Sequence, residues 1–360
     1  MPGWVLAERP PVFIPGDAKA VLERLPRGYA ALMPSAGKTA PLTLIQVLLD
    51  TAARSGDARL ATRAEALLAR LPASDSRSAA GIKARAFAAQ HRHDFAGALQ
   101  LLDPLIARDP RDGDARLSRA QILLVQGRLD RARADCAALS LGIDAESGLL
   151  CVAALSLRMG NYPTAASLLD RMLAQAPAES GISQYVLSMR GAVASRAGDA
   201  DADRWFERAL APAPDDVRTL AAYARHLRSR GEHRRIVHLL ATAPDTDGLR
   251  LQLALAVHAL DLPQAAVLTA SQGRRYALAH EVGTQPEMRD EAEFLLTLRG
   301  NATAALALAQ RNFESQRDYE DVDILRRAAM AAHRPDALAE LERWERSQHL
   351  VPMPPSGARR

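Results

Sequence analysis

A short polar turn recurs along the chain at nearly constant intervals, and this spacing constrains the fold more than any other feature of the sequence. A first turn falls at residues 56–57, and the eight turn positions that follow are separated by 34, 33, 38, 33, 30, 39 and 33 residues. Glycine at such a position can adopt the left-handed backbone that ends a helix. A period near 34 residues predicts about nine helix-turn-helix hairpins, each burying its apolar face against its neighbours. The expected turn positions are His93, Gly127, Gly160, Gly198, Gly231, Asp261, Gly300 and His333.

The segments between the turns have the apolar spacing of amphipathic helices. Leu117, Ala120 and Leu124 are separated by three and four residues, and no segment alternates with a period of two. Aromatic residues make up only 4% of the chain, while alanine and leucine dominate its apolar content, which favours helices over strands. The sequence therefore predicts an all-α protein, and no apolar run is long enough to be a transmembrane segment. Prolines that stop the second helix of a pair are Pro110, Pro177, Pro214 and Pro244.

Small residues recur where the two helices of a pair would cross, and small side chains let two helices approach closely. In one later pair, Gly191 takes the first small position and Phe206 takes the aromatic position of the second helix. This pattern resembles the tetratricopeptide repeat, with the best match over residues 79–244 and a degenerate form over residues 245–350. The sets of two small residues and a closing proline that carry the resemblance are Ala86, Ala98 and Pro110, and Ala153, Ala165 and Pro177.

The resemblance implies a right-handed α-solenoid over residues 41–350, in which the first helix of each hairpin lines the concave face. Residues 1–40 are expected to form an N-terminal cap with one short helix at residues 17–26, which starts at a capping aspartate. Residues 351–360 are rich in proline and basic residues and are expected to be a disordered tail.

The sequence leaves the compartment and the state of the cysteines open. The phrase at residues 21–26 and the turns near residues 93 and 127 are similar to uncharacterised bacterial tetratricopeptide proteins, which are often exported. Residues 1–7 do not form a complete signal peptide, so the chain is periplasmic if its true precursor carries one and cytoplasmic otherwise. Cys136 and Cys151 lie in apolar helical stretches, where they either serve as small free hydrophobes or pair across adjoining helices.

No set of residues has the spacing that catalysis, a cofactor or a metal ion requires. Residues 35–39 match part of a phosphate-binding loop, but Leu32 stands at the motif's first glycine and no strand precedes it. His91 and His93 lie in a turn without a third ligand, and His226 with its neighbouring histidines is expected on a solvated helix surface. No serine has the setting of a hydrolase nucleophile. The sequence therefore predicts a protein that is not an enzyme and binds no cofactor or metal.

The register set by the turns points one group of first-helix residues toward the concave face, and every charged member of this group is basic. We expect this face to bind a protein or peptide segment that carries acidic groups, because arginine forks pair with carboxylates. The alternative is that these arginines are simply solvated, as single basic residues on helices commonly are. The predicted groove residues are Lys83, Phe87, Gln90, Gln121, Arg158, Tyr185, Arg196, Arg218, Arg225 and Arg228.

A stacked solenoid with this face predicts a protein-interaction scaffold or adaptor. The alternative is a helical repeat protein that binds single-stranded nucleic acid, which is disfavoured because aromatic residues are too few and too irregular to stack one base per repeat. Phe87 occupies an asparagine position of the clamp by which some family members hold a C-terminal carboxylate, so binding of chaperone tails is not expected. The partner's identity and the oligomeric state are not specified by the sequence.

Overall fold

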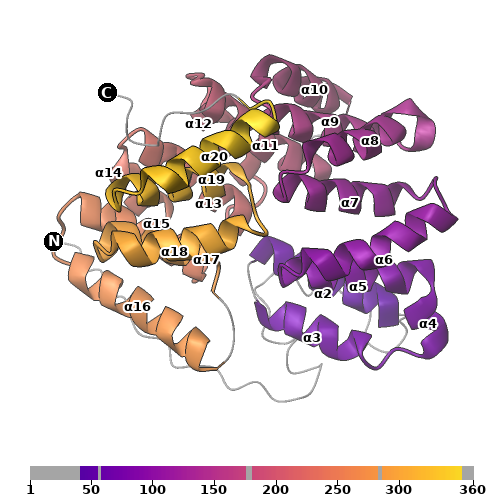
Figure 1. Cartoon of the computed structure of the whole chain (residues 1–360), viewed down its shortest axis with the longest axis horizontal. Coiled ribbons are helices and arrows are strands. Elements are labelled where there is room, and N and C mark those ends of the chain that lie inside the picture. The colour runs from indigo at the N-terminus through magenta and orange to yellow at the C-terminus, as the bar shows by residue number, and fades with distance from the viewer. Residues whose placement is uncertain (1–40, 56–57, 176–180, 283–285, 351–360) are drawn as a thin grey trace.

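The computed structural model describes residues 41–55, 58–175, 181–282 and 286–350. Within these ranges the chain forms consecutive helical hairpins and contains no strand (Figure 1). The expected cap helix at residues 17–26, the loop at 35–39, the turn at 56–57 and the tail at 351–360 lie outside the described residues. The described chain is the all-α solenoid that the spacing of the turns predicts.

Each hairpin consists of a first and a second helix. The first helices are α2 (Pro41–Ser55), α5 (Ala79–His91), α7 (Gly113–Val125), α9 (Ala145–Arg158), α11 (Gly181–Ala197), α13 (Val217–Ser229), α15 (Asp247–Ala259), α17 (Met288–Glu293) and α19 (Tyr319–Ala331). The second helices are α3 (Ala58–Leu68), α6 (Phe95–Arg108), α8 (Leu129–Ala138), α10 (Tyr162–Gln175), α12 (Ala202–Leu210), α14 (His233–Leu239), α16 (Ala265–Glu281), α18 (Ala302–Phe313) and α20 (Pro335–Ser347). A short helix, α4 (Ala73–Arg77), precedes α5, and the π-helical turns η2 (Leu139–Ile143) and η3 (Phe294–Leu298) extend α8 and α17.

The eight turn positions predicted after residue 57 all have the left-handed backbone, with φ between 51° and 75°. Three of them, His93, Asp261 and His333, adopt it without being glycine. At the first of these turns the amide of Asp94 donates to the carbonyl of Ala89 at 2.9 Å, which satisfies a carbonyl at the end of α5. The prediction of the turns is therefore confirmed, including those in the degenerate C-terminal third.

The small residues at the helix crossings are buried, as the repeat pattern requires. Ala98 and Ala165 are completely buried, and Ala86 is only 1% exposed. A Cβ atom added to Gly191 would lie 2.9 Å from the ring of Phe206, so glycine is the only residue that fits beneath this aromatic side chain without displacing it. Close approach of the helices explains why size recurs at these positions while the neighbouring residues vary.

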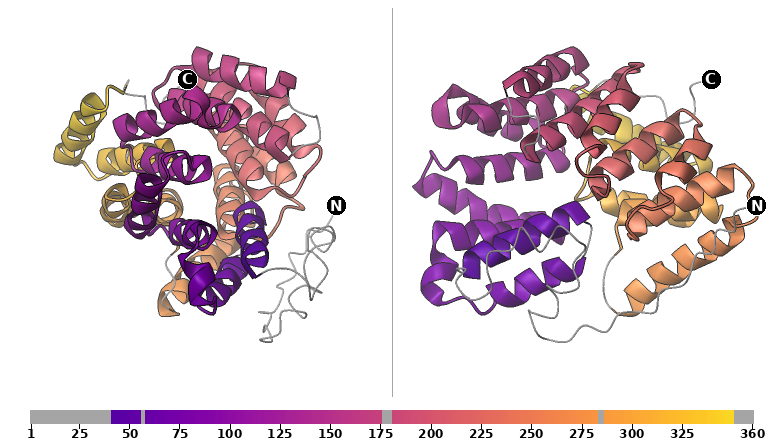
Figure 2. Two further views of the ribbon diagram at one scale, coloured as in Figure 1. Left: turned by 90° about the vertical axis from the view of Figure 1, so that its right-hand side faces the viewer. Right: turned by 180° about the vertical axis from the view of Figure 1, so that it is seen from behind.

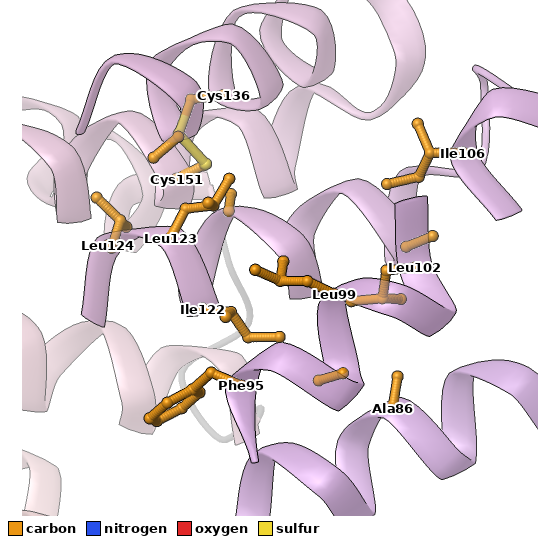
Figure 3. Packing of buried hydrophobic residues seen from close by; sticks show 14 of the residues in the cluster. Ala86, Phe95, Leu99, Leu102, Ile106, Ile122, Leu123, Leu124, Cys136 and Cys151 are labelled. Atoms are coloured by element: carbon orange, nitrogen blue, oxygen red, sulfur yellow. A yellow bond between two sulfur atoms is a disulfide. The ribbon is translucent and has the colours of Figure 1, made fainter. Parts of the chain in front are cut away.

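The hydrophobic core is a series of clusters, and the buried members of each cluster come from hairpins that are adjacent along the chain. In one cluster Leu99 and Leu102 of α6 pack against Ile122 of α7 (Figure 3). Cys136 and Cys151 join the same cluster and form a disulfide, with their Cα atoms 5.2 Å apart. Of the two states that the sequence leaves open, the structure has the paired one.

The stack of hairpins curls so far that its last hairpins contact the inner side of earlier ones. In Figure 1, α18–α20 lie in front of α11–α15, and the left view of Figure 2 shows how the stack curls so that the C-terminal helices face the earlier ones. The backbone amide of Arg317 donates to the carbonyl of Val125 at 2.7 Å, and the Trp344 ring lies against Gly127. A linear solenoid would leave an open hollow along its first helices, whereas here the chain itself crosses that hollow.

Candidate functional site

Four arginines of the predicted groove converge from successive first helices, and we call them the arginine face: Arg158 of α9, Arg196 of α11, and Arg225 and Arg228 of α13. All four pair with carboxylates of residues 287–347, which we call the C-terminal hairpins. The arginines are thus neither free for an external partner nor simply solvated. The structure brings these four predicted residues together and adds an acidic partner from the same chain.

Arg158 holds the N-terminus of α19. Its guanidinium donates to the Asp318 carboxylate at 2.6 Å and also to the backbone carbonyl of Arg317. The Arg158 side chain is only 12% exposed. Asp318 is also the N-cap of α19, where its side chain accepts from the amide of Tyr319 at 2.8 Å. The Asp318 carboxylate therefore both caps a helix and accepts a hydrogen bond from an arginine that lies 160 residues earlier in the chain.

Glu320 is shared by two arginines. Its carboxylate lies 2.9 Å from the Arg196 guanidinium and 3.6 Å from that of Arg225. The Arg196 guanidinium also lies over the Tyr319 ring, a cation–π contact. Burial disfavours the charged form of Glu320, but the surrounding guanidinium groups outweigh burial and hold its pKa below its usual range. The carboxylate is therefore ionised in the folded protein near neutral pH.

Glu293, at the end of α17, is the most buried acid at this contact, with a side chain that is 8% exposed. It forms an ion pair with Arg228 across the groove at 3.0 Å, and it accepts hydrogen bonds from Arg327 and the Thr297 hydroxyl within the C-terminal hairpins. Burial alone would raise its pKa, but the charges of Arg228 and Arg327 lower the pKa to about 2.

His93 extends the contact to the second hairpin. Its Nε2 lies 3.0 Å from the Glu287 carboxylate, which also accepts from the Gln316 side chain at 3.2 Å. The hydrogen bond to Glu287 raises the pKa of His93, despite partial burial. Burial raises the pKa of Glu287, whereas the hydrogen bond from His93 and the charge of Arg289 lower it. The net result is a pKa of about 2. His93, expected only as a polar turn residue, is therefore part of the site.

The remaining predicted groove residues do not contact the C-terminal acids through ion pairs. Lys83 bridges Asp112 and Asp114 of the next hairpin at 3.2 and 2.9 Å, and Phe87 packs in the N-terminal core cluster. Gln90 and Gln121 are half-buried on α5 and α7.

Tyr185 and Arg218 form the accessible part of the predicted groove. The guanidinium of Arg218 lies 5.6 Å from the centre of the Tyr185 ring, and that ring is 36% exposed. Arg218 has no ion-pair partner among the residues that the structure describes. These two side chains therefore offer an external partner an aromatic ring and an uncompensated charge.

One histidine expected at the surface is buried instead. His226 is 5% exposed and packs against both Phe206 and Tyr223, with its Nδ1 2.8 Å from the Ser195 hydroxyl. The surface interpretation was wrong because this residue faces the second helix of the preceding hairpin. Burial lowers its pKa, so it is neutral near neutral pH.

A cavity of about 440 Å³ lies between α12, α13 and α14, apart from the arginine face. Its walls include Leu210, Leu227 and Leu239, and its polar rim includes Arg235, which is paired with Asp203 at 3.0 Å. Within the described residues, no three His, Cys, Asp or Glu side chains are placed to hold a metal ion. Over the same ranges, every helix is too short or too polar to cross a bilayer.

Comparison with known proteins agrees with the hairpin architecture. Residues 89–141 match the family described as Tetratricopeptide repeat. Among proteins of curated function, none matches this sequence.

Solved structures that are similar to the chain include the following three. A tetratricopeptide repeat protein from Parabacteroides merdae is 16% identical, with a TM-score of 0.42 over 69% of this chain and 97% of its own. The Cut9–Hcn1 hetero-tetramer of the APC/C is 13% identical, with a TM-score of 0.38 over 85% of this chain and 65% of its own. The TPR domain of P58(IPK) is 15% identical, with a TM-score of 0.23 over 82% of this chain and 99% of its own. The family match covers residues 89–141, and helical hairpins of similar spacing continue on both sides of this segment.

Proposed function

We propose that this chain is a non-catalytic interaction scaffold that binds an acidic segment of a partner protein on its arginine face. Stacked helical hairpins provide an extended concave surface, which suits a segment of another protein better than a small substrate. The observation that carries the proposal is the position of Glu320 between Arg196 and Arg225, which come from two successive first helices. The spacing of these guanidinium groups is thus already suited to a carboxylate on a protein chain.

The accessible part of the groove extends this surface. Tyr185 offers a half-exposed ring, and Arg218 beside it has its charge available. A segment that combines carboxylates with an apolar side chain would use both kinds of contact. The disulfide between Cys136 and Cys151 supports a further part of the proposal, namely that the scaffold works in an oxidising compartment, because disulfides persist there.

The test uses a labelled synthetic peptide with the sequence of residues 315–325, which carries Asp318, Tyr319 and Glu320. Fluorescence anisotropy should show saturable binding to the full chain, and a matched peptide with Asp318 and Glu320 replaced by asparagine and glutamine should bind at least about tenfold more weakly. Arg196→Gln with Arg225→Gln should weaken binding of the acidic peptide. The control, Arg274→Gln with Arg299→Gln, removes two exposed arginines elsewhere and should leave binding unchanged.

Equal binding of the acidic and amide peptides, or equal binding by the groove and control variants, would contradict the proposal. A short oligothymidylate is the second ligand in the same assay. If it bound more tightly than the acidic peptide and lost affinity in the groove variant, the nucleic-acid alternative would replace the protein-binding one.

A further inference from the structure

The contact between the C-terminal hairpins and the arginine face joins parts of the chain that a solenoid normally keeps apart. In a stack of repeats each hairpin contacts its sequence neighbours. Here Arg158 meets Asp318, which lies 160 residues away, and Arg196 meets Glu320, which lies 124 residues away. This long-range contact is therefore distinct from the contacts between neighbouring hairpins that build the stack.

The charges on the two sides of this contact are sorted by sign. In the ion pairs that cross this contact, the cation comes from the second to sixth hairpins: His93, Arg158, Arg196, Arg225 and Arg228. Every anionic member comes from the C-terminal hairpins: Glu287, Glu293, Asp318 and Glu320. Such complementarity favours one specific mutual orientation and makes the contact sensitive to salt.

The C-terminal hairpins have a hydrophobic core of their own. Its buried members run from Ala292 to Leu341 and include Leu306 and Ile324, and its partly buried members run from Leu295 to Trp344. This cluster contains no residue of the second to sixth hairpins. Separation of the two sides would break ion pairs, the backbone bond at Val125 and the contact of Trp344 with Gly127, but it would leave the buried members of this core packed together. The curvature of the stack is the sum of small rotations between repeats. A slight uncoiling of the stack is therefore enough to separate the C-terminal hairpins from the arginine face.

The segment at the centre of the contact has the form of a bound ligand. Asp318, Tyr319 and Glu320 are consecutive, and arginines from α9, α11 and α13 hold the first carboxylate, the ring and the second carboxylate. The face therefore already recognises two carboxylates that flank an aromatic side chain at the start of a helix. An external segment with that chemistry would make the same contacts.

We propose that the C-terminal hairpins are a built-in acidic competitor that covers the arginine face, and that a partner segment with carboxylates around an aromatic residue displaces them. This inference rests on the proposed function, because displacement requires that the face bind such a partner. The closed form reduces the apparent affinity for the partner by the fraction of time during which the face is open. Weakening the internal contact should therefore strengthen external binding.

The test replaces Asp318 by asparagine and Glu320 by glutamine in the full chain. Asparagine retains an N-cap at α19, so the variant removes two charges from the contact while it preserves the helix start. The matched control, Glu340→Gln with Glu342→Gln, removes two charges from the exposed side of α20. Circular dichroism should show the same helicity for all three proteins.

Two measurements on these proteins separate the inference from the proposed function. Small-angle X-ray scattering should give a larger radius of gyration for the contact variant alone, and raising the salt concentration should expand the wild type toward it. The acidic peptide of residues 315–325 should bind the contact variant about tenfold more tightly than the wild type or the control.

The outcomes are distinct. If the peptide binds all three proteins equally, the inference is overturned and the proposed function stands. If the contact variant expands but neither it nor the wild type binds the peptide, the proposed function fails and the competition fails with it. If the contact variant neither expands nor gains affinity, the C-terminal hairpins are a fixed part of the fold.

Discussion

Replacement of Glu293 by glutamine should destabilise the protein by about 3 kcal/mol near neutral pH. The side chain is 8% exposed, and its pKa of about 2 lies well below the ordinary value of 4.5 because two arginines outweigh the effect of burial. A difference of about 2.5 between the two pKa values corresponds to about 3 kcal/mol, at about 1.36 kcal/mol per pH unit. Glutamine has the same shape, so it isolates the loss of charge.

The pH dependence makes this prediction specific. A carboxylate with a lowered pKa stabilises the fold fully above its unfolded pKa of 4.5, and the stabilisation is lost as the pH falls through about 2. At about pH 3, the free energy of unfolding of the wild type should therefore exceed that of the Glu293→Gln variant by only about 1 kcal/mol. Urea denaturation followed by circular dichroism measures the free energy of unfolding at both pH values.

A control and a double-mutant cycle complete the experiment. Glu342→Gln removes an exposed carboxylate from α20 and should change the free energy of unfolding by less than about 0.5 kcal/mol. Combining Glu293→Gln with Arg228→Met measures how much of the effect comes from the contact across the groove and how much from Arg327. A loss for Glu293→Gln that is equally large at both pH values, or no larger than the control, would refute the reasoning.

Three further predictions follow from single features of the structure. Replacement of Cys136 and Cys151 by serine should lower the free energy of unfolding by about 3 kcal/mol, because the disulfide closes a loop of 15 residues; denaturation with and without a reductant measures this difference. Gly191→Ala should cost about 1–3 kcal/mol in thermal or urea unfolding, because its new methyl group would meet the Phe206 ring at 2.9 Å, and Phe206→Leu should recover part of that loss. His93→Gln should destabilise the protein more at mildly acidic than at alkaline pH. Because the folded-state pKa of His93 is raised, its ion pair stabilises the fold fully below the unfolded pKa of 6.5, and this stabilisation is lost as the pH rises through the folded pKa. A difference in the free energy of unfolding that grows with pH would contradict the assignment.

The hairpins could be predicted because each leaves a local mark in the sequence. A helix that ends in a left-handed residue favours glycine there, and helices that cross closely favour small residues such as Ala98 and Ala165. Both marks are set within one repeat, so they persist even where the rest of the repeat has diverged. This explains why the turns at Asp261 and His333 were found without a glycine.

The pairing of the cysteines could not be predicted because it depends on distance across two helices. Cys136 ends one hairpin and Cys151 lies within the first helix of the next, with η2 between them. A disulfide forms only when the Cα atoms come within a narrow range of separations. The sequence contains no local signal for the 5.2 Å that the structure shows.

The closure of the groove also escaped prediction, although part of its signal is present in the sequence. Glu287 and Glu320 stand thirteen residues before the turns at Gly300 and His333, as Arg218 stands before the turn at Gly231. Extending the register of the arginine face into the degenerate hairpins would thus have revealed acids at inner positions. Their contact with the arginines could still not be predicted, because it depends on a curvature that accumulates over many repeats.

The most direct test of the central claim is the distance between two spin labels, one on each side of the contact. Asp130→Cys on α8 and Glu342→Cys on α20 place the labels at exposed positions, and the native cysteines are already paired and buried. Double electron–electron resonance should give one narrow distance distribution for the free chain and a longer one at saturation with the acidic peptide of residues 315–325. A distribution that stays unchanged while the peptide is bound would contradict the claim that an acidic partner replaces the C-terminal hairpins on the arginine face.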